Sequence, residues 1–485
     1  MITVALFCIV VAAAWLWKQR SRNTNEPPEF PGAWPILGHA PSLIGDSCKL
    51  WSGINDLANQ SYDIGGVVTC RIGPRTVYIV TDPDDMFTIA NTCLEKDGFY
   101  DFAKPWLGEG LVTGKLSIWK NHRKFLNPAF SQIVLDSFLG VFNSQSRKLV
   151  KDLKQEVGKG LFDHWIYTRH NALETICLTA LGVDFTDSML NSKYVEATEQ
   201  IFNTMVDRFM KFWWHSKHTF RFSGVKRKQD ACLKILHNMS NTVLQRRKSE
   251  FNGNICAERR TKFKAFMDLL LELSVERGVL NDREIREHVD TMIVGGHDTS
   301  ANVLMFTMLL LGAHPEVQEK VAAEILEVLG DGDRDVEKQD LSQLVYLEAV
   351  IKESMRIHTI VPVLARQLDR DVKLKNYTLT AGRTCFLFVF GLHRHPVWGS
   401  DRHQFRPERW LEPSSLPDNP NAFAAFSVGR RMCIGKAYAL MSMKISLAHL
   451  LRHYRITADD SKLRLKIDVM LKPDSGYFVS IERRT

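Results

Sequence analysis

Apolar residues recur with helical spacing through most of this chain of 485 residues, and this pattern constrains the fold most strongly. Ten segments have it: 116–130, 140–158, 164–182, 192–212, 227–250, 262–276, 283–312, 315–330, 341–357 and 434–452. Strand-like runs are short and few: Val67–Ile72, Thr76–Val80, Thr384–Phe388 and Gly476–Ile481. The sequence therefore predicts a mainly α protein with small β-sheets.

The first residues combine an uncharged run with a basic cluster. Met1–Trp17 carries no charged side chain, and three cations follow within residues 18–22. The run is at the short end for a membrane span, and the cations after it predict that the rest of the chain is cytoplasmic. We expect a signal-anchor helix with a basic stop over residues 1–22. The alternative is a cleaved signal peptide, because Ala12–Ala14 resembles a cleavage site, but the cations follow the apolar run instead of preceding it.

Four prolines between Pro27 and Pro35 exclude a helix there and favour a stiff extended segment. We predict a proline-rich hinge over residues 23–38 and a single large catalytic domain over residues 39–485. This body contains no long low-complexity linker and no internal repeat. It is large for one hydrophobic core, so we expect sublobes within it.

Composition excludes several classes of protein. Hydrophobic residues make up 45% and charged residues 24%, which is the usual globular mixture and excludes a disordered chain. The net charge of +8 suits an anionic membrane surface but is too dilute to indicate nucleic-acid binding. Nine widely spaced cysteines without a C-x-x-C pair predict a reducing compartment.

Aromatic and basic residues are interleaved between residues 208 and 222. The aromatic members are Phe209, Phe212, Trp213, Trp214, Phe220 and Phe222, and the basic members are Arg208, Lys211, Lys217 and Arg221. Such a segment can bind single-stranded nucleic acid, lie in a membrane interface or simply pack. The predicted anchor favours the membrane, and we expect no nucleic-acid partner.

Cys433 carries the clearest chemical signal. It precedes an apolar helical segment, Lys436–His449, and stands close to Arg430 and Arg431. The positive end of a helix and nearby cations favour a thiolate over a thiol. A thiolate is either a nucleophile or a metal ligand, whereas a lone cysteine is more often buried and inert.

The run Phe426–Gly435 resembles the haem-ligand signature of the cytochrome P450 family, F-x-x-G-x-R-x-C-x-G, at every fixed position. The resemblance implies that Cys433 is the thiolate ligand of a haem iron and that Arg431 contacts a haem propionate. It also implies that Phe426 packs beside the ligand and that Gly435 allows the backbone to approach the sulfur and the haem.

Two further motifs resemble propionate-binding positions of the same family. Trp119 and Arg123 match W-x-x-x-R, which by itself also describes an amphipathic basic helix. The resemblance implies that both donate hydrogen bonds to a propionate. Arg366, which follows Val361–Val363, is expected to bind a propionate as well.

Glu353 and Arg356 match the E-x-x-R motif of the family, and Arg409 lies in a P-E-R-W run. An acid and a base three residues apart usually decorate a solvated helix surface. The resemblance implies instead that Glu353, Arg356 and Arg409 form a buried structural triad that locks the haem-side loop. Removing one member would then leave a buried charge unpaired, at a cost of ~3–5 kcal/mol.

Gly295–Ser300 lies in the longest apolar helical segment and matches [AG]-G-x-[DE]-T-[TS]. The resemblance implies that Thr299 lines the oxygen pocket and that Asp298 relays protons. The flanking residues His288–Thr291 resemble the branch that contains microsomal fatty-acid ω-hydroxylases and their insect relatives. Many of those enzymes carry a glutamate that esterifies the haem where this chain has Gly295. We therefore predict haem b bound non-covalently, with an axial thiolate.

The resemblance implies a monooxygenase that inserts one oxygen atom of O2 into a hydrophobic small molecule: a fatty acid, a terpenoid or hormone, or a xenobiotic. The expected electron donor is an NADPH-dependent FMN/FAD reductase, with cytochrome b5 as a second candidate. The expected location is the endoplasmic reticulum membrane, single-pass, with the catalytic domain cytoplasmic and in contact with lipid.

Two alternatives remain at this stage. One is a haem-thiolate isomerase or dehydratase that acts on peroxides without a reductase. The other is a membrane-tethered haem- or lipid-binding protein without turnover. The complete Asp298–Thr299 pair argues against both.

Overall fold

The computed structural model describes residues 25–183, 188–253, 266–275 and 277–484. Two compact units divide the chain. Unit 1 comprises Met1–Phe99, Val361–Arg402 and Pro417–Met432, and unit 2 comprises Tyr100–Ile360, His403–Leu416 and Cys433–Thr485. The predicted anchor, residues 1–22, lies outside the described residues. Among the helices that are described, none is both long and apolar enough to cross a membrane.

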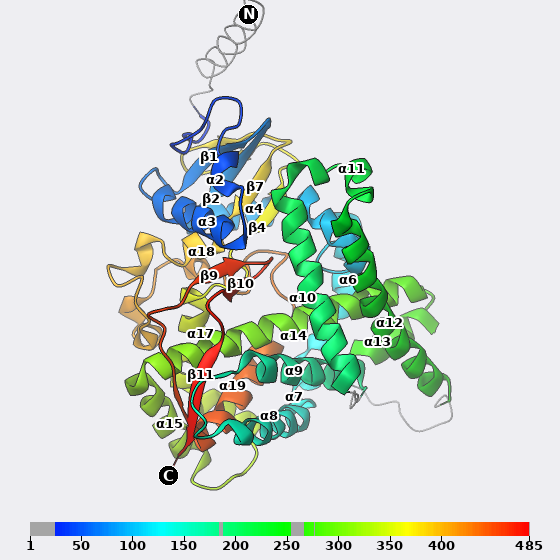
Figure 1. Cartoon of the computed structure of the whole chain (residues 1–485), viewed down its shortest axis with the longest axis vertical. Helices are drawn as coiled ribbons and strands as arrows, with labels where there is room; N and C mark the ends of the chain where they lie inside the picture. Colours follow the sequence, from blue (N-terminus) through cyan, green and yellow to red (C-terminus); the bar gives the residue numbers. More distant parts are fainter. Residues whose placement is uncertain (1–24, 184–187, 254–265, 276, 485) are drawn as a thin grey trace, which may run out of the picture. The chain divides into compact units, whose positions relative to one another are not determined.

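Unit 1 is built on a four-stranded sheet in the order β1–β2–β7–β4 (Figure 1). Its strands are β1 (Val67–Ile72), β2 (Arg75–Val80), β7 (Thr384–Leu387) and β4 (Leu364–Gln367). Strands β2 and β7 are parallel, whereas β1 pairs with β2 and β4 pairs with β7 in antiparallel register. The remaining elements are α2 (Ala40–Leu43), α3 (Ser47–Ser61), α4 (Pro83–Thr92), α18 (Val389–Leu392) and the strand pair β5 (Val372–Lys373) and β6 (Thr378–Leu379).

The apolar side chains of this sheet pack on α4 and α18 in one core. Val67, Tyr78 and Leu387 from the strands are buried together with Ile89 of α4 and Leu392 of α18. The valine-rich strands alternate apolar side chains toward this core, so tertiary packing supports their intrinsic strand preference.

The proline-rich segment is bonded to the edge of this sheet. The backbone N–H of Phe30 donates to the carbonyl of Thr69 at 2.9 Å, and the Thr69 hydroxyl donates to the carbonyl of Pro27 at 2.9 Å. Prolines lack the N–H that a central strand needs, so they are tolerated at such an edge. The described part of the predicted hinge is therefore fixed along β1.

Unit 2 is mainly helical. Its helices are α5 (Lys104–Leu107), α6 (Leu116–Leu126), α7 (Gln132–Asp136), α8 (Leu139–Leu153), α9 (Trp165–Ile176), α10 (Ser188–Met210), α11 (Lys217–Arg221), α12 (Gly224–Gly253), α13 (Phe266–Val275), α14 (Asp282–Ala313), α15 (Pro315–Leu329), α16 (Lys338–Gln343), α17 (Val345–Ile357) and α19 (Lys436–His453). Its strands form a three-stranded sheet in the order β3–β11–β8 and a two-stranded sheet, β10–β9. They are β3 (Phe162–Asp163), β8 (Tyr454–Thr457), β9 (Leu465–Ile467), β10 (Leu471–Pro473) and β11 (Phe478–Arg483).

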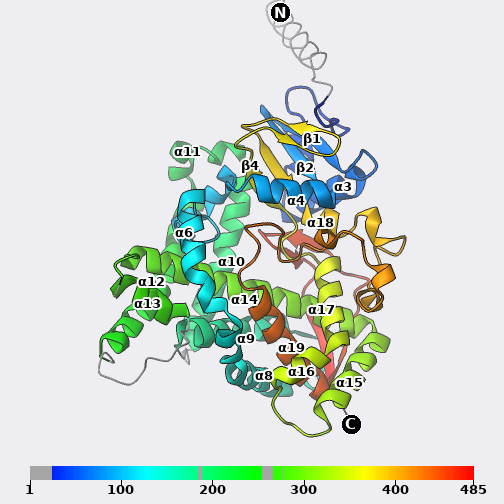
Figure 2. The same cartoon turned by 180° about the vertical axis from the view of Figure 1, so that it is seen from behind.

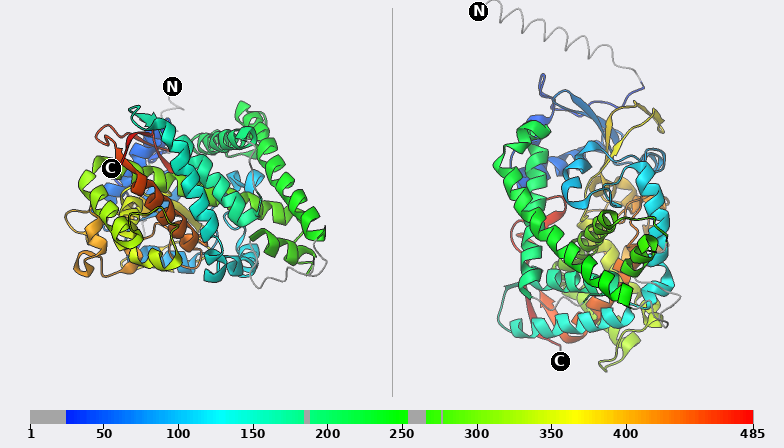
Figure 3. Two further views of the ribbon diagram at one scale, coloured as in Figure 1. Left: turned by 90° about the horizontal axis from the view of Figure 1, so that it is seen from below. Right: turned by 90° about the vertical axis from the view of Figure 1, so that its right-hand side faces the viewer.

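Helix α14 is the central element of unit 2. It begins at a capping box in which Asn281 and Glu284 bond reciprocally to each other's backbone N–H groups, which satisfies two free donors at the helix start. It packs against α9, α12 and α17, and α19 packs against α8, α15 and α17 (Figure 2). Helices α10 and α12 pack on each other, and both belong to the green part of the ribbon in Figure 3.

The mainly α architecture with small sheets agrees with the prediction, and the differences are local. The predicted helix 341–357 is two helices, because Leu344 leaves the helical conformation (φ −75°, ψ 66°) between α16 and α17. The predicted helix 164–182 continues past α9 only as a π-helical turn, Cys177–Leu181, which ends at Gly182 in the left-handed region (φ 64°).

Candidate functional site

The boundary between the units falls between Met432 and Cys433, so the two halves of the cysteine motif belong to different units. In unit 2, Cys433 lies just before α19, whose N-cap residue is Gly435. The Gly435 N–H donates a hydrogen bond to the Cys433 sulfur. This donor belongs to the free N–H groups at the start of α19, so the local chain geometry stabilises a negative sulfur.

The charge state of Cys433 reflects opposing effects. Burial raises the pKa of the thiol, while the Gly435 N–H and the charge of Arg123 lower it, and the net shift is upward. The Gly435 N–H and the charge of Arg123 act toward the predicted thiolate, and desolvation acts against it. A cation bound to the sulfur would reverse this balance, since metal coordination deprotonates a thiol.

Helix α6 carries Trp119 and Arg123. Trp119 is buried, and the Arg123 Nε donates to the Asn127 side-chain oxygen at 2.9 Å. The charge of Arg123 acts on Cys433. The structure thus brings together two residues 310 positions apart that sequence analysis assigned to one site.

In unit 1, the other half of the motif turns at Gly429. Its φ of 73° lies in the left-handed region, and a Cβ there would be 2.9 Å from the carbonyl oxygen of Ala90. Only glycine fits this turn. Phe426 is half-buried, Arg430 is exposed, and Arg431 is buried.

Arg431 shares unit 1 with Arg366 and Lys96. Arg366 is 1% exposed, forms no ion pair with any residue that the structure describes, and donates to the carbonyl of its neighbour Ala365. Its Nε is buried without a hydrogen-bond partner among the described residues. Lys96 forms an isolated β-bridge with Arg366, and its pKa is lowered well below the usual value by burial and by Arg366 and Arg431.

Lys96, Arg366 and Arg431 bring three basic side chains close together in unit 1. Burying like charges side by side is unfavourable unless an anion joins them. The two propionates of haem b are anions of the required kind, so these residues fit the cofactor. Sequence analysis missed Lys96, because it lies in no motif and in no periodic segment.

The two glycines of α14 have different surroundings. A Cβ on Gly295 would meet no heavy atom within 4 Å, whereas one on Gly296 would lie 2.5 Å from Ile176 Cδ1 of α9. Gly296 therefore allows α14 and α9 to pack closely, while Gly295 leaves the helix surface bare. The Thr299 hydroxyl donates to the Gly295 carbonyl at 2.7 Å, so Thr299 lies over this bare surface.

Asp298 precedes Thr299 on α14 and is fully buried. Arg169 Nε lies 3.1 Å and Lys472 Nζ lies 3.6 Å from its carboxylate oxygens. Burial alone would raise the pKa of Asp298, but Lys472, Arg169 and His297 together hold it below its usual value. The carboxylate is therefore ionised at neutral pH.

Further charges extend this cluster. Arg169 also pairs with Glu199 at 3.1 Å, and Lys472 pairs with Asp468 at 3.1 Å. Burial raises the pKa of Asp468 to about 6. Sequence analysis did not find Arg169 or Lys472, because each is an isolated cation on its own element and only the tertiary fold brings it to α14.

The predicted triad is assembled within unit 2. Glu353 accepts two hydrogen bonds of 2.8 Å from Arg356 and one of 2.9 Å from Arg409. The Trp410 indole and the backbone N–H of Arg406 each donate to the same carboxylate at 3.0 Å. All three charged side chains are 0% exposed. The arrangement ties α17 to the segment 404–410 through one carboxylate.

Comparisons with known proteins agree with this geometry. The sequence matches the family model described as Cytochrome P450 over residues 27–480. It is 33% identical to cytochrome P450 4V2 of Mus musculus over 500 residues, which cover 100% of this chain and 94% of that protein.

Two insect proteins are similarly related. Cytochrome P450 4c3 of Drosophila melanogaster is 32% identical over 491 residues, covering 96% of this chain and 91% of that protein. Cytochrome P450 4c21 of Blattella germanica is 31% identical over 489 residues, covering 97% of each. The predicted relationship is confirmed, including the kinship with insect proteins.

Proposed function

Since this chain belongs to the cytochrome P450 family and is a haem-thiolate monooxygenase, we propose that Cys433 is the ligand of the haem iron. Haem b, when bound, supplies the activation of O2 with electrons that derive from NADPH. The assignment rests on one observation: the Cys433 sulfur lies just before α19, where it accepts a hydrogen bond from the Gly435 N–H and is close to the charge of Arg123. Together they stabilise the thiolate that iron binding requires.

The propionates are assigned to two sets of residues. Arg366 and Arg431, with Lys96 beside them, supply positive charge from unit 1. Trp119 and Arg123 supply donors from α6 in unit 2. Charge-assisted hydrogen bonds of this kind are strong and directional, so they fix the orientation of the cofactor. Phe426 packs beside the ligand, and Gly295 carries no carboxyl group, which leaves the haem without a covalent link.

Thr299 and Asp298 are assigned to proton delivery. Thr299 already donates to the Gly295 carbonyl, and a hydroxyl can accept a second hydrogen bond and so hold water or a proton at the bare face of α14. Asp298, ionised by Arg169 and Lys472, is the adjacent proton acceptor. Glu353, Arg356 and Arg409 have a structural role, because all are buried and bonded mainly to one another.

The aromatic segment near residue 212 supports membrane contact. Arg208 is buried and stacks over Phe102 and Phe220, so part of the segment is ordinary packing. Phe212 and Phe222 are 67% and 85% exposed, and large exposed aromatic side chains beside cations suit a lipid interface.

The cellular setting follows from this contact. With the predicted anchor at residues 1–22, the exposed aromatic side chains support a single-pass protein of the endoplasmic reticulum with a cytoplasmic catalytic domain.

The partners are a redox donor and a hydrophobic substrate, as the family requires. We assign electron delivery to an FMN/FAD reductase that draws on NADPH, with cytochrome b5 as a second donor. The substrate classes proposed are fatty acids, terpenoids or hormones, and xenobiotics. Neither peroxide rearrangement nor binding without turnover has a specific observation in its favour.

The assignment of Cys433 is tested with the full-length protein expressed with haem. Cys433→Ala should abolish the Soret band that is diagnostic of thiolate ligation in the reduced carbon-monoxide complex, and with it NADPH-dependent product formation. Cys48→Ala, a half-buried cysteine of α3, is the matched control and should keep both. Retention of the band in Cys433→Ala would refute the assignment.

A further inference from the structure

A cationic cleft lies in unit 2 where α8, the end of α19 and the last strand, β11, come together. Its volume is about 380 Å³. Its wall contains one carboxylate, that of Asp333, and six arginine or lysine side chains: Arg147, Lys151, Lys154, Arg452, Arg483 and Arg484. None of these residues belongs to the haem-binding motifs.

Half of these cations are neutralised by the protein. Arg147 pairs with Asp335 at 2.9 Å and also with Asp333, and Arg484 pairs with Glu319 at 2.7 Å. Arg452 shares Asp333 at 3.3 Å.

The other half carry unbalanced charge. Lys151, Lys154 and Arg483 are exposed, and none of them forms an ion pair with a residue in the described part of the chain. The six cations of the cleft therefore exceed the three carboxylates that pair with them, Asp333, Asp335 and Glu319.

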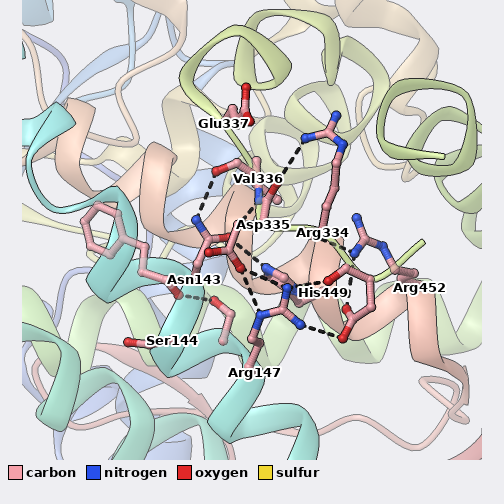
Figure 4. A network of polar contacts seen from close by, with 12 residues as sticks. Asn143, Ser144, Arg147, Arg334, Asp335, Val336, Glu337, His449 and Arg452 are labelled. Carbon is pink, nitrogen blue, oxygen red and sulfur yellow. Dashed lines mark hydrogen bonds and ion pairs between the residues drawn. The ribbon is translucent and has the colours of Figure 1, made fainter. Parts of the chain in front are cut away.

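Arg452 lies at the buried side of the cleft. Its side chain is 10% exposed, and one terminal nitrogen donates to Asp333 and to the carbonyl of Arg334 at 3.0 Å, within the network drawn in Figure 4. Its Nε and Nη2 are buried without a hydrogen-bond partner among the described residues. A buried guanidinium with two unused donors is costly unless a ligand completes its bonds.

The positive potential extends into the protein behind the cleft. His449 lies one turn before Arg452 on α19. Its pKa is lowered to about 4, first by burial and then by the charges of Arg147 and Arg452. Asp333 and Asp335 act in the opposite direction on His449 and do not cancel this effect.

We propose that this cleft binds a compact polyphosphate anion, either free in solution or carried as the headgroup of a phosphorylated lipid. Arginine forks bind phosphate oxygens in pairs, and four arginines line the cleft: Arg147, Arg452, Arg483 and Arg484. A volume of about 380 Å³ is within the range of small-molecule sites. A small anion fits inside the concavity, whereas a flat acidic protein surface does not enter it.

The test uses the full-length holoenzyme and a charge-reversed variant, Lys151→Glu/Lys154→Glu/Arg483→Glu. These three side chains are exposed, so the variant should fold, and an unchanged carbon-monoxide spectrum verifies that it does. Lys228→Glu is the matched control, because Lys228 is an exposed lysine of α12 that forms no ion pair with any residue the structure describes. Binding of tripolyphosphate is measured by calorimetry, and binding to vesicles containing phosphatidylinositol bisphosphate is measured by sedimentation.

We expect saturable binding in at least one arm, weakened about 100-fold in the triple variant because three attractions become repulsions, and unchanged in Lys228→Glu. Binding only in the tripolyphosphate arm identifies a free anion, and binding in the vesicle arm identifies a lipid headgroup. The proposal is refuted if neither probe binds, if the triple variant binds as tightly as the wild type, or if citrate, a polycarboxylate, competes as well as tripolyphosphate.

Discussion

Glu353 holds two buried arginines at once, which makes its replacement the sharpest test of the structure. Glu353→Gln keeps the size of the side chain but removes its charge. The carboxylate accepts at least five hydrogen bonds, three of them from Arg356 and Arg409. The amide nitrogen of glutamine is a donor and would replace an oxygen that now accepts, so at least two of those hydrogen bonds are lost. The guanidinium groups of Arg356 and Arg409 would keep their charges in a site with 0% exposure.

Breaking a buried ion pair by removing one partner costs ~3–5 kcal/mol. Since whole domains are stable by only ~5–15 kcal/mol, this is a large fraction of the total. A change of 1 kcal/mol shifts the melting temperature of a domain of 150–250 residues by about 2–4 °C, so we expect a decrease of about 6 °C or more. The holoenzyme should be followed by circular dichroism and by its carbon-monoxide spectrum during heating.

The control is Glu412→Gln, two positions beyond the segment 404–410 that the triad fixes. Glu412 is half exposed and pairs with Arg406 at the surface, and such pairs contribute about 0–1 kcal/mol. If Glu353→Gln lowers the melting temperature no more than Glu412→Gln does, the triad does not stabilise the fold as described.

Three further predictions follow from the site. Gly296→Ala should destabilise the protein by ~1–3 kcal/mol through overpacking against α9, whereas Gly295→Ala should be neutral or stabilising by thermal melting; equal effects would contradict the packing. Burial lowers the pKa of His164 and of His297 to about 4, so their full contribution to the free energy of unfolding is present above pH 6.5. Each contribution, up to ~3 kcal/mol, is lost as the pH falls toward 4. Melting temperatures that stay constant from pH 7 to 4.5 would refute this. Asp298→Asn should lower product formed per NADPH consumed while leaving the carbon-monoxide spectrum unchanged, and unchanged coupling would exclude a proton-relay role.

The elements that sequence analysis predicted well are those whose information is local. Helix α14 has a long apolar repeat and a capping box at its start, and α19 follows a glycine, so neither depends on distant contacts to be recognised. The meeting of Glu353, Arg356 and Arg409 could be predicted although about fifty residues separate them, because each residue belongs to a motif that is recognisable in the sequence.

What could not be predicted depends on tertiary contacts. Lys96, Arg169 and Lys472 are single cations on separate elements, and nothing in their neighbours distinguishes them from solvated charges. Strand β4 is four residues long, and it is held by pairing with β7 instead of by its own pattern. The electrostatic balance at the Cys433 thiol could not be predicted from the sequence, because the cost of desolvation depends on what surrounds the sulfur in space.

The adjacent glycines of α14 separate two tasks within one turn of helix. Gly296 sets how closely two scaffold helices approach, and Gly295 exposes a peptide plane with the Thr299 hydroxyl above it. A larger residue at 295 would narrow the room available to a guest molecule without disturbing the framework. Substitutions intended to change which molecule binds beside α14 should therefore be made at Gly295, and Gly296 should be kept.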